Sequence, residues 1–355
     1  MPQRDIIVVG ASAGGVTALL EFARSLPKDF KGTVFVVLHI PPHSPSNLPT
    51  ILSKASPIKA VHPKDGSPIK SGLIYVAPPD HHMLLEKNRI LVKKGPKENR
   101  FRPSVDALFR SAAYVYGPRV IGVILSGLLN DGTSGLWSIK RMGGLSVVQT
   151  PEDASYPSMP INALEYVKAD HIVAAAEMGA LVTKLGKRKA PKRVRVKKQE
   201  MELLKLEVII AMRDNAFEMG IMNMGEFTAF TCPECNGILI RLKEGDLVRF
   251  RCHTGHAFTA SALLADLSAS VEDKLWQAMR GLEETTMLLK QISHHFKENG
   301  LMDASRVFMK KSKATSDRAR VIHDSVFTQE LLSEDIRHDK SDKPPTGKTK
   351  TKISS

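Results

Sequence analysis

The feature that most constrains this chain is an apolar strand that runs into a glycine-rich turn and then into a helix. Residues 5–9 read DIIVV, residues 10–15 read GASAGG, and residues 16–26 have helical character. Glycines allow a tight turn, and the turn contains the G-x-S-x-G pattern of a nucleophile elbow, with Ser12 at its centre. A serine placed there stands at the carboxyl end of a strand, beside the positive end of a helix, where ligands of open α/β sheets bind.

The same turn has two other interpretations. A degenerate dinucleotide-binding fingerprint would require an acidic residue about 20 residues further on, at the end of the second strand, to hold a ribose. The second expected strand, VFVVL at 34–38, is instead followed by His39. This disfavours a dinucleotide cofactor. The remaining alternative is a serine that only hydrogen-bonds its neighbours in the turn.

Residues 5–183 alternate between strand-like and helix-like runs. Several expected strands are apolar throughout, as in a parallel sheet that helices cover on both faces. The sequence therefore predicts an α/β fold with a doubly wound, mostly parallel sheet in a Rossmann-like three-layer arrangement. The expected strands are 6–9, 34–38, 73–78, 89–94, 119–125, 145–149 and 171–175, and the expected helices are 16–26, 46–55, 104–116, 133–142 and 160–168.

Local signals add detail to this fold. The stretch LLEKNRI between the expected strands 73–78 and 89–94 indicates a hairpin turn. Ser104, Thr133 and Ser134 stand at the starts of expected helices, where hydroxyl side chains commonly cap the first N–H groups.

Two polar residues follow other strands of the same expected sheet. His39 comes directly after 34–38, and Asp131 comes after 119–125 and a short turn of small residues. Because the carboxyl ends of parallel strands meet at one edge of a sheet, we expect both side chains to lie near Ser12. Serine needs a base, and histidine needs an acceptor that fixes its tautomer. A packed histidine and a helix-capping aspartate are the structural alternatives, but the three residues together predict nucleophilic catalysis.

Five separated stretches carry a family resemblance. They are GASAGG, LHIPP, RPSVDALFRSAA, GVILSGLLNDGTSG and GG…VVQTPEDASYPSMP, in this order. Over about residues 5–185 the chain resembles the catalytic domain of the chemotaxis protein-glutamate methylesterases (CheB type). The resemblance implies that Ser12 is the nucleophile, His39 the general base and acid, and Asp131 the orienting carboxylate, with no catalytic cofactor. It also implies hydrolysis of glutamyl methyl esters on chemoreceptor helices; some members of the family also deamidate receptor glutamines.

The sequence departs from the family pattern in three respects. Ala13 stands where the family usually has threonine, and Leu128-Leu129 stand where it usually has Met-Gly. Family members often carry an N-terminal receiver domain, whereas this sequence begins at the catalytic strand, so control by an attached receiver is not expected. Three further polar residues in the family stretches either line the substrate groove or serve the structure: His82, Arg102 and Ser104.

The three cysteines of the chain lie close together in the sequence. Such clustered thiols indicate metal binding rather than a disulfide framework. A C-x2-C pair followed by C-x3-H fits the two knuckles of a zinc ribbon, and a set of thiolates and one imidazole favours a structural zinc. The predicted ligands are Cys232, Cys235, Cys252 and His256. His256 is preferred over His253 as the fourth ligand, because Cys252 and His253 are adjacent in the chain and would strain one tetrahedral site. The alternative is that the cysteines pack in a small core.

The remainder of the chain divides by composition. We expect the catalytic domain at 1–185, a basic linker at 186–199, an amphipathic helix within 200–228 that covers 200–224, a zinc-ribbon-like module at 229–260, a helical hairpin at 261–336 and a disordered tail at 337–355. The hairpin follows from apolar residues that recur every three or four positions between 261 and 298. Asn299-Gly300 then supplies a stop.

The net charge of +14 is concentrated in two places. Residues 184–198 contain nine Lys and Arg and no acid, and residues 339–355 add five lysines against two aspartates. A solvated linker explains the first segment, and nucleic acid is not favoured because no aromatic residues are interleaved with the charges.

Location and partners complete the expectations. The sequence contains no apolar run of about 18 residues and no signal peptide, so we expect a cytoplasmic protein with no membrane insertion. The resemblance implies methylated chemoreceptor helices and other chemosensory proteins as partners. Two rival functions stay open: a regulatory protein with weakened catalysis, and a nucleic-acid-binding protein that uses the zinc module and the basic linker.

Overall fold

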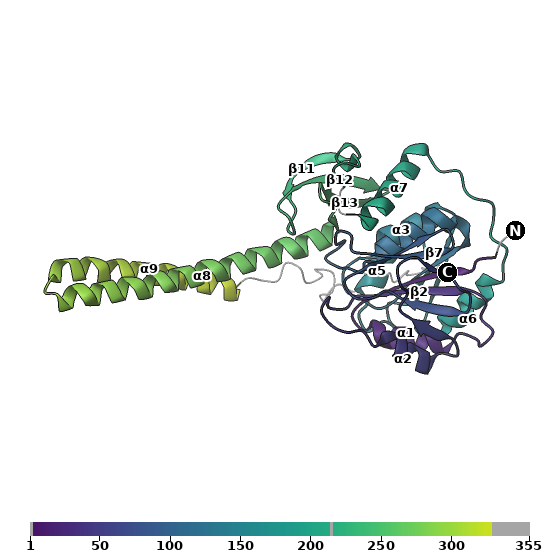
Figure 1. The fold of residues 1–355 in the computed structure, drawn as a ribbon, viewed down its shortest axis with the longest axis horizontal. Helices are drawn as coiled ribbons and strands as arrows, with labels where there is room; N and C mark the ends of the chain where they lie inside the picture. Colours follow the sequence, from purple (N-terminus) through teal and green to yellow (C-terminus); the bar gives the residue numbers. More distant parts are fainter. Residues whose placement is uncertain (1–2, 214–215, 329–355) are drawn as a thin grey trace, which may run out of the picture. The chain divides into compact units, whose positions relative to one another are not determined.

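The computed structural model describes residues 3–213 and 216–328. Contacts divide the chain into two compact units, Met1–Leu263 and Leu264–Ser355 (Figure 1). The finer division expected from composition stays a prediction. The expected tail at 337–355 and the last part of the expected hairpin, 329–336, lie outside the described residues.

A seven-stranded sheet forms the centre of the first unit. Its strand order is β10-β9-β8-β1-β2-β5-β3, and every neighbouring pair is parallel. The strands are β1 (Ile6–Ala11), β2 (Thr33–Leu38), β3 (Lys59–Val61), β5 (Leu73–Val76), β8 (Val120–Ile124), β9 (Leu145–Gln149) and β10 (His171–Val173). The chain winds outward in both directions from β1 and β8, so the crevice at their carboxyl ends is a topological switch point. The predicted doubly wound sheet is confirmed.

Helices cover both faces of this sheet. Residues Ile7 and Val9 of β1 pack toward one face with α1, α2 and α6, while Ile6 and Val8 pack toward the other with α3, α4 and α5. Figure 1 shows α1, α2 and α6 on one side of the strands and α3 on the other. The helices are α1 (Gly15–Arg24), α2 (Leu48–Ala55), α3 (Val105–Tyr116), α4 (Thr133–Arg141), α5 (Ser158–Tyr166) and α6 (Ala175–Gly186). A short 3₁₀ turn, η1 (Gly117–Arg119), precedes β8.

The hairpin was predicted at the right turn but with the wrong first strand. β6 (His82–Glu86) pairs with β7 (Arg89–Lys93) around Lys87-Asn88, and β4 (Ser67–Pro68) pairs with β7 to complete a small sheet. β5 instead belongs to the large sheet. Pro78 and Pro79 lack N–H groups, and Asp80 has a φ of 54°. The chain therefore breaks there, before β6.

Helix α6 was missed. It begins where the expected strand 171–175 ends and extends into the basic segment 184–198. Met178, Val182 and Leu185 recur at helical spacing and are buried on the sheet. The residues 187–197 that follow contain no α-helix.

Helix α7 (Lys198–Met212) is shorter than the expected 200–224. Arg213 is extended, and a 3₁₀ turn, η2 (Ile221–Asn223), follows Gly220, whose φ is 77°. Local composition favoured a longer helix, but the next residues turn toward the β-module.

The predicted hydroxyl caps are wrong. Neither Ser104 nor Thr133 or Ser134 caps its own helix. The Ser104 hydroxyl donates to Asp131, and the Ser134 hydroxyl donates to Glu244 of the β-module. Tertiary partners have replaced the local ones.

The β-module is a four-stranded antiparallel sheet in the order β11-β12-β13-β14. Its strands are β11 (Glu226–Thr231), β12 (Ile238–Glu244), β13 (Leu247–Cys252) and β14 (Ala257–Thr259). Ion pairs join β12 and β13 of this module to α3, to α7 and to the loop before α3. The paired side chains are all at most 5% exposed: Glu98, Arg110, Glu207, Glu244, Arg249 and Arg251. Burial alone would raise the pKa of Glu207, but the arginines around it lower that pKa below its usual value. Since charges are costly to bury unpaired, this cluster fixes how the module packs.

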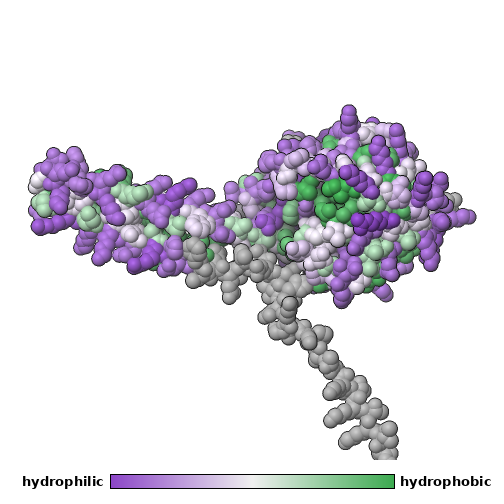
Figure 2. All heavy atoms as spheres, turned by 90° about the horizontal axis from the view of Figure 1, so that it is seen from below, coloured by the Kyte–Doolittle hydropathy of each residue, from purple (hydrophilic) through white to green (hydrophobic). Residues whose placement is uncertain are grey.

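Two long helices and the turn between them contain the described residues of the second unit, and the first helix begins four residues earlier, at the end of the first unit. α8 (Ala260–Glu298) and α9 (Met302–Thr328) are joined by a turn in which Gly300 has a φ of 73°. Phe296 stacks on Phe308 with ring centroids 5.3 Å apart, and the Ser293 hydroxyl donates to the Ser305 carbonyl at 2.8 Å. Their outer surface is largely hydrophilic (Figure 2). Among the described residues, no helix has the length and apolar character needed to cross a membrane.

A substitution at Gly10 can test how α3 packs on β1. A Cβ at this position would lie 2.2 Å from Val105 Cγ1. We expect Gly10→Ala to lower the free energy of unfolding by about 1–3 kcal/mol, as overpacking does, measured by urea denaturation. Adding Val105→Ala removes both methyl groups and should restore part of the loss. An unchanged stability in Gly10→Ala would contradict this packing.

Candidate active site and metal centre

The serine turn is shaped by two glycines. Gly10 has no room for a Cβ, and Gly14 has a φ of 69°, a conformation that side chains rarely adopt. The Ser12 N–H donates to the Ser126 carbonyl at 2.9 Å, and the Gly15 N–H donates to the Ser12 carbonyl at 2.9 Å. Ser12 is thereby held at the end of β1, just before α1, while the N–H groups of Ala13 and Gly14 are the next along the turn.

The structure brings the three predicted catalytic residues together at the switch point. The Ser12 hydroxyl lies 3.1 Å from His39 Nδ1, and His39 Nε2 lies 2.8 Å from Asp131 Oδ2. The side chains of His39 and Asp131 are 3% and 1% exposed. Because the carboxylate accepts a hydrogen bond from the Nε2–H group, the neutral tautomer with its proton on Nε2 leaves Nδ1 as an acceptor for the serine hydroxyl. This arrangement can move a proton from the hydroxyl to the ring.

The Asp131 carboxylate accepts hydrogen bonds from five donors. Besides His39 they are the Asn99 amide, the Ser104 hydroxyl and the backbone N–H groups of Val105 and Asp106. Burial alone would raise the pKa of Asp131, but the hydrogen bond and charge of His39, followed by the other donors, lower it well below its usual value. Asp131 therefore stays ionised, and it caps the first turn of α3 from outside that helix.

A second carboxylate lies beside the first. Asp106 is fully buried, and the Asn99 amide donates to both Asp106 Oδ2 and Asp131 Oδ1, each at 2.9 Å. Burial and the nearby charge of Asp131 raise the pKa of Asp106 to about 8. The pair therefore carries one charge at neutral pH, on Asp131.

Sequence reasoning missed two residues of this site. Phe101 stacks on the His39 ring with centroids 3.7 Å apart and planes inclined by 10°. Asn99 bridges the two carboxylates. Both precede the family stretch that begins at Arg102 and belong to no helix or strand, so neither periodicity nor motif spacing could have identified them.

The other polar residues of the family stretches have structural roles. His82 is completely buried, donates from Nε2 to the Pro96 carbonyl at 2.8 Å and accepts from the Ser104 N–H at 3.2 Å. Its burial lowers the pKa of its imidazole. Arg102 pairs with Asp80 at 2.6 Å. Neither side chain contacts Ser12, whereas Ser104 supports Asp131.

One family departure has a visible conformational consequence. Leu129, which stands where the family usually has glycine, has a φ of 60°. A bulky residue in this region is strained. The Asn162 amide donates to the Leu129 carbonyl at 2.9 Å and helps to hold this conformation.

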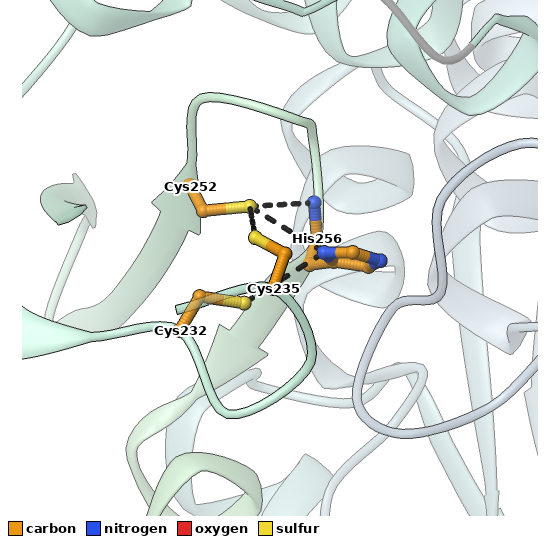
Figure 3. A group of neighbouring side chains, drawn as sticks. All are labelled: Cys232, Cys235, Cys252 and His256. Carbon is orange, nitrogen blue, oxygen red and sulfur yellow. Dashed lines mark hydrogen bonds between the residues drawn. The ribbon is translucent and has the colours of Figure 1, made fainter. Parts of the chain in front are cut away.

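The three cysteines and His256 converge in the β-module (Figure 3). Their four ligand atoms lie within 4.8 Å of one another. Zinc bonds of about 2.3 Å to sulfur and about 2.0 Å to nitrogen require tetrahedral edges of about 3.8 Å and about 3.5 Å. The Cys235–Cys252 sulfur separation is 3.7 Å, and His256 Nδ1 lies 3.7 Å from Cys232 Sγ and 3.5 Å from Cys252 Sγ. The residues therefore fit a tetrahedral zinc ion.

The surroundings of these ligands support that fit. Cys232 and Cys252 are completely buried. The His256 N–H donates to Cys252 Sγ at 3.2 Å, as in the knuckles that orient metal ligands. The hydrogen bond from Cys232 lowers the pKa of the Cys252 thiol. The ring of His253 points elsewhere, against Gly237.

A doubly wound α/β sheet that carries a serine, a histidine and an aspartate in a hydrogen-bonded series is the arrangement of a serine hydrolase. Residues 7–182 match the family described as CheB methylesterase. A "putative protein-glutamate methylesterase/protein-glutamine glutaminase" of Leptospira interrogans is 39% identical over 51% of this chain and 94% of its own length. The chain thus belongs to the CheB methylesterase family and is a carboxylic-ester hydrolase.

Other relatives are longer or are known by structure. The "protein-glutamate methylesterase/protein-glutamine glutaminase 2" of Methanosarcina mazei is 32% identical over 51% of this chain but only 52% of its own length. The crystal structure of the Thermotoga maritima CheB methylesterase catalytic domain aligns with 52% of this chain and 99% of that domain, at 31% identity and a TM-score of 0.49. The similarity to these proteins is confined to about half of the chain.

Asp106 predicts a specific dependence of stability on pH. The pKa of Asp106 is about 8 in the folded state against 3.8 for an exposed carboxyl group. Its stabilising contribution is therefore complete below pH 3.8 and is lost as pH rises through about 8. Asp106→Asn stays neutral. We therefore expect the free energy of unfolding of Asp106→Asn, relative to wild type, to rise between pH 5 and pH 8 in urea titrations. The control Asp29→Asn removes an exposed carboxylate and should show a constant difference; a constant difference for Asp106→Asn would contradict the shift.

The metal centre predicts one zinc ion per chain by elemental analysis. Cys252→Ser and His256→Ala each remove a ligand and should reduce the zinc content at least tenfold after dialysis against a weak chelator. His253→Ala is the matched control, because His253 lies outside the ligand set, and it should retain the full content. If His256→Ala kept its zinc and His253→Ala lost it, His253 and not His256 would be the fourth ligand.

Proposed function

We propose that this protein is a protein-glutamate methylesterase that hydrolyses glutamyl methyl esters on chemoreceptor-like proteins, in chemosensory adaptation. The observation that carries the proposal is the hydrogen-bonded series from Ser12 through His39 to Asp131, at 3.1 Å and 2.8 Å, in a chain of this family. The relatives' names supply the substrate class.

The first half of the reaction forms an acyl-enzyme. His39 Nδ1 takes the proton of the Ser12 hydroxyl while the oxygen attacks the ester carbonyl. Asp131, ionised and held by its other donors, accepts from Nε2 and stabilises the imidazolium that forms. His39 then returns the proton to the departing methoxide, which leaves as methanol.

The developing oxyanion needs donors at the serine turn. The Ser12 N–H is already bonded to Ser126, so we assign the role to the N–H groups of Ala13 and Gly14, at the positive end of α1. A backbone donor does not depend on its side chain, so the alanine that replaces the family's threonine is compatible with this role.

The second half of the reaction restores the enzyme. Water gives a proton to His39 and attacks the glutamyl ester on Ser12. The substrate protein leaves with a free glutamate side-chain carboxylate, while the proton returns to the serine oxygen. The same path acting on a glutamine would release ammonia instead of methanol. The relatives' names include a protein-glutamine glutaminase activity, which makes deamidation a second candidate.

The surface beside Ser12 suits a protein substrate. Leu128 and Tyr156 are 50% and 45% exposed. Gly127, next to Leu128, lies so close that its Cβ would be 2.9 Å from the Ser12 Cβ, and Tyr156 lies against Gly14. Exposed apolar side chains at the rim of a site favour contact with a partner's apolar surface, and a receptor helix has such a surface.

The proposed zinc has a structural role. Cys232, Cys235, Cys252 and His256 form a closed set with no position for substrate. When bound, the metal would supply a cross-link between the loop that joins β11 to β12, the end of β13 and the loop before β14.

Replacing the nucleophile tests the proposal. Ser12→Ala removes the attacking oxygen, and we expect at least a 10³-fold loss of methanol release from methylated receptor membranes, as for nucleophiles of other serine hydrolases. Ser71→Ala replaces an exposed serine of another loop and should keep full activity. Methanol release by Ser12→Ala at the wild-type rate would overturn the assignment.

A further inference from the structure

One short loop segment, residues 97–99, contacts both the β-module and the Asp131 carboxylate. β14 begins directly after the ligand His256. The Ala257 N–H donates to the Lys97 carbonyl at 3.2 Å, and the Asn99 N–H donates to the Ala257 carbonyl at 2.7 Å. Glu98 therefore forms a single parallel β-bridge with Ala257, the residue directly after the predicted metal ligand His256.

The side chain of Asn99 carries the contact onward. Its oxygen accepts the Thr259 N–H of β14 at 2.9 Å, and its amide nitrogen donates to Asp131 and Asp106, each at 2.9 Å. Asn99 is 3% exposed. The oxygen and both amide hydrogens thus have partners, and this one residue links the metal module to the carboxylate that orients His39.

The backbone of this segment is strained. Asn99 and Arg100 have φ values of 50° and 77°. Non-glycine residues adopt such conformations rarely, and these conformations persist where the surroundings impose them. The next residue, Phe101, is the one that stacks on His39. The loop that contacts both the acid and the base is thus held in an unfavourable conformation by β14.

Ion pairs of Glu98 give the segment 97–99 a second attachment to the β-module. Glu98 is 1% exposed and pairs with Arg251 of β13 at 2.9 Å and with Arg110 of α3. Burial alone would raise the pKa of Glu98, but the two arginines lower it, so this buried carboxylate stays ionised. Arg251 is the neighbour of the metal ligand Cys252, so the second attachment also originates beside the metal centre.

We propose that Asn99 is the positioning residue through which the metal centre orders Asp131 and His39, so that metal occupancy sets the rate of ester hydrolysis at a site that the metal does not touch. The proposal rests on the proposed function for the reaction itself. Its geometry requires only that Ser12 is a nucleophile activated by His39.

The physical cause is the loss of one anchor. Metal binding supplies much of the folding free energy of small zinc modules. Without the metal, β14 loses its anchor at His256, and Asn99 loses the Thr259 N–H that holds its amide. The strained loop then relaxes, Asp131 loses a donor, and the stacked Phe101 moves from His39. The binding surface at Leu128 and Tyr156 belongs to other loops, so substrate affinity is preserved.

The experiment uses the full chain in four forms: wild type and Asn99→Ala, each loaded with zinc and each stripped by a chelator. The readouts are kcat and KM for methanol release, and the rate at which a fluorophosphonate labels Ser12, which requires no receptor. We expect zinc-loaded Asn99→Ala to lose about 10–100-fold in kcat and in labelling rate, the range typical of residues that orient an active group. Its KM and zinc content stay unchanged.

Removing zinc from wild type should lower the labelling rate by a similar factor. Removing it from Asn99→Ala should lower that rate little further, since both changes break one link and their effects are not additive. Lys93→Ala is the control: it lies in β7, shortly before the segment, and its side chain forms a surface ion pair with Asp65. It should behave as wild type.

A direct structural readout accompanies these rates. Hydrogen exchange of the Asn99 amide should be slow with zinc and faster without it, while circular dichroism retains the signal of the large sheet. Wild-type kcat in Asn99→Ala, independent losses that multiply, or unchanged exchange after zinc removal would each overturn the proposal. So would unfolding of the whole first unit without zinc, because the metal would then act on folding. If Ser12 labelling follows zinc but no methanol is released, only the proposed substrate fails.

Discussion

The buried carboxylate of Asp131 is the constraint on which the rest of the site depends. A charge in this position is tolerated only if donors surround it, and they come from the His39 ring, the first turn of α3 and the Asn99 amide. The hydrogen bond to Asp131 orients each of these groups. The same interactions that stabilise the buried charge also orient the imidazole toward Ser12. Burial and the charge of Asp131 together raise the pKa of the neighbouring Asp106.

A second set of buried charges joins the β-module to the catalytic sheet. Glu98 and Arg110 come from the catalytic part, Glu207 from α7, and Arg249 and Arg251 from β13. Breaking one such pair leaves an uncompensated buried charge, which makes the packing specific. Family similarity covers residues 7–182, whereas this contact uses residues beyond that range. The four predicted metal ligands, the ion cluster and Asn99 therefore form one connected attachment around Asp131.

Much of the fold could be predicted, because apolar strands that alternate with amphipathic helices have few arrangements other than a doubly wound sheet. The adjacency of Ser12, His39 and Asp131 follows from the same rule, since each comes after a strand and parallel strands share one carboxyl edge. Their catalytic roles, the metal and the domain boundaries stay predictions. The wrong predictions concern residues whose conformation depends on tertiary contacts. The Ser104 hydroxyl donates to Asp131 instead of capping its own helix, and α6 was not predicted because its end lies in the basic segment.

The sequence alone determined most strands and helices of the large sheet, the glycine turn that holds Ser12, and the spacing of the three cysteines and His256. These are local properties, because they depend on periodicity and on backbone conformations near each residue. Only the tertiary structure decided that Phe101 covers His39, that Asn99 bridges two carboxylates, and that the β-module lies against them. Those contacts join segments up to 160 residues apart. They depend on complementary charge and hydrogen bonding that appear only when the chain has folded.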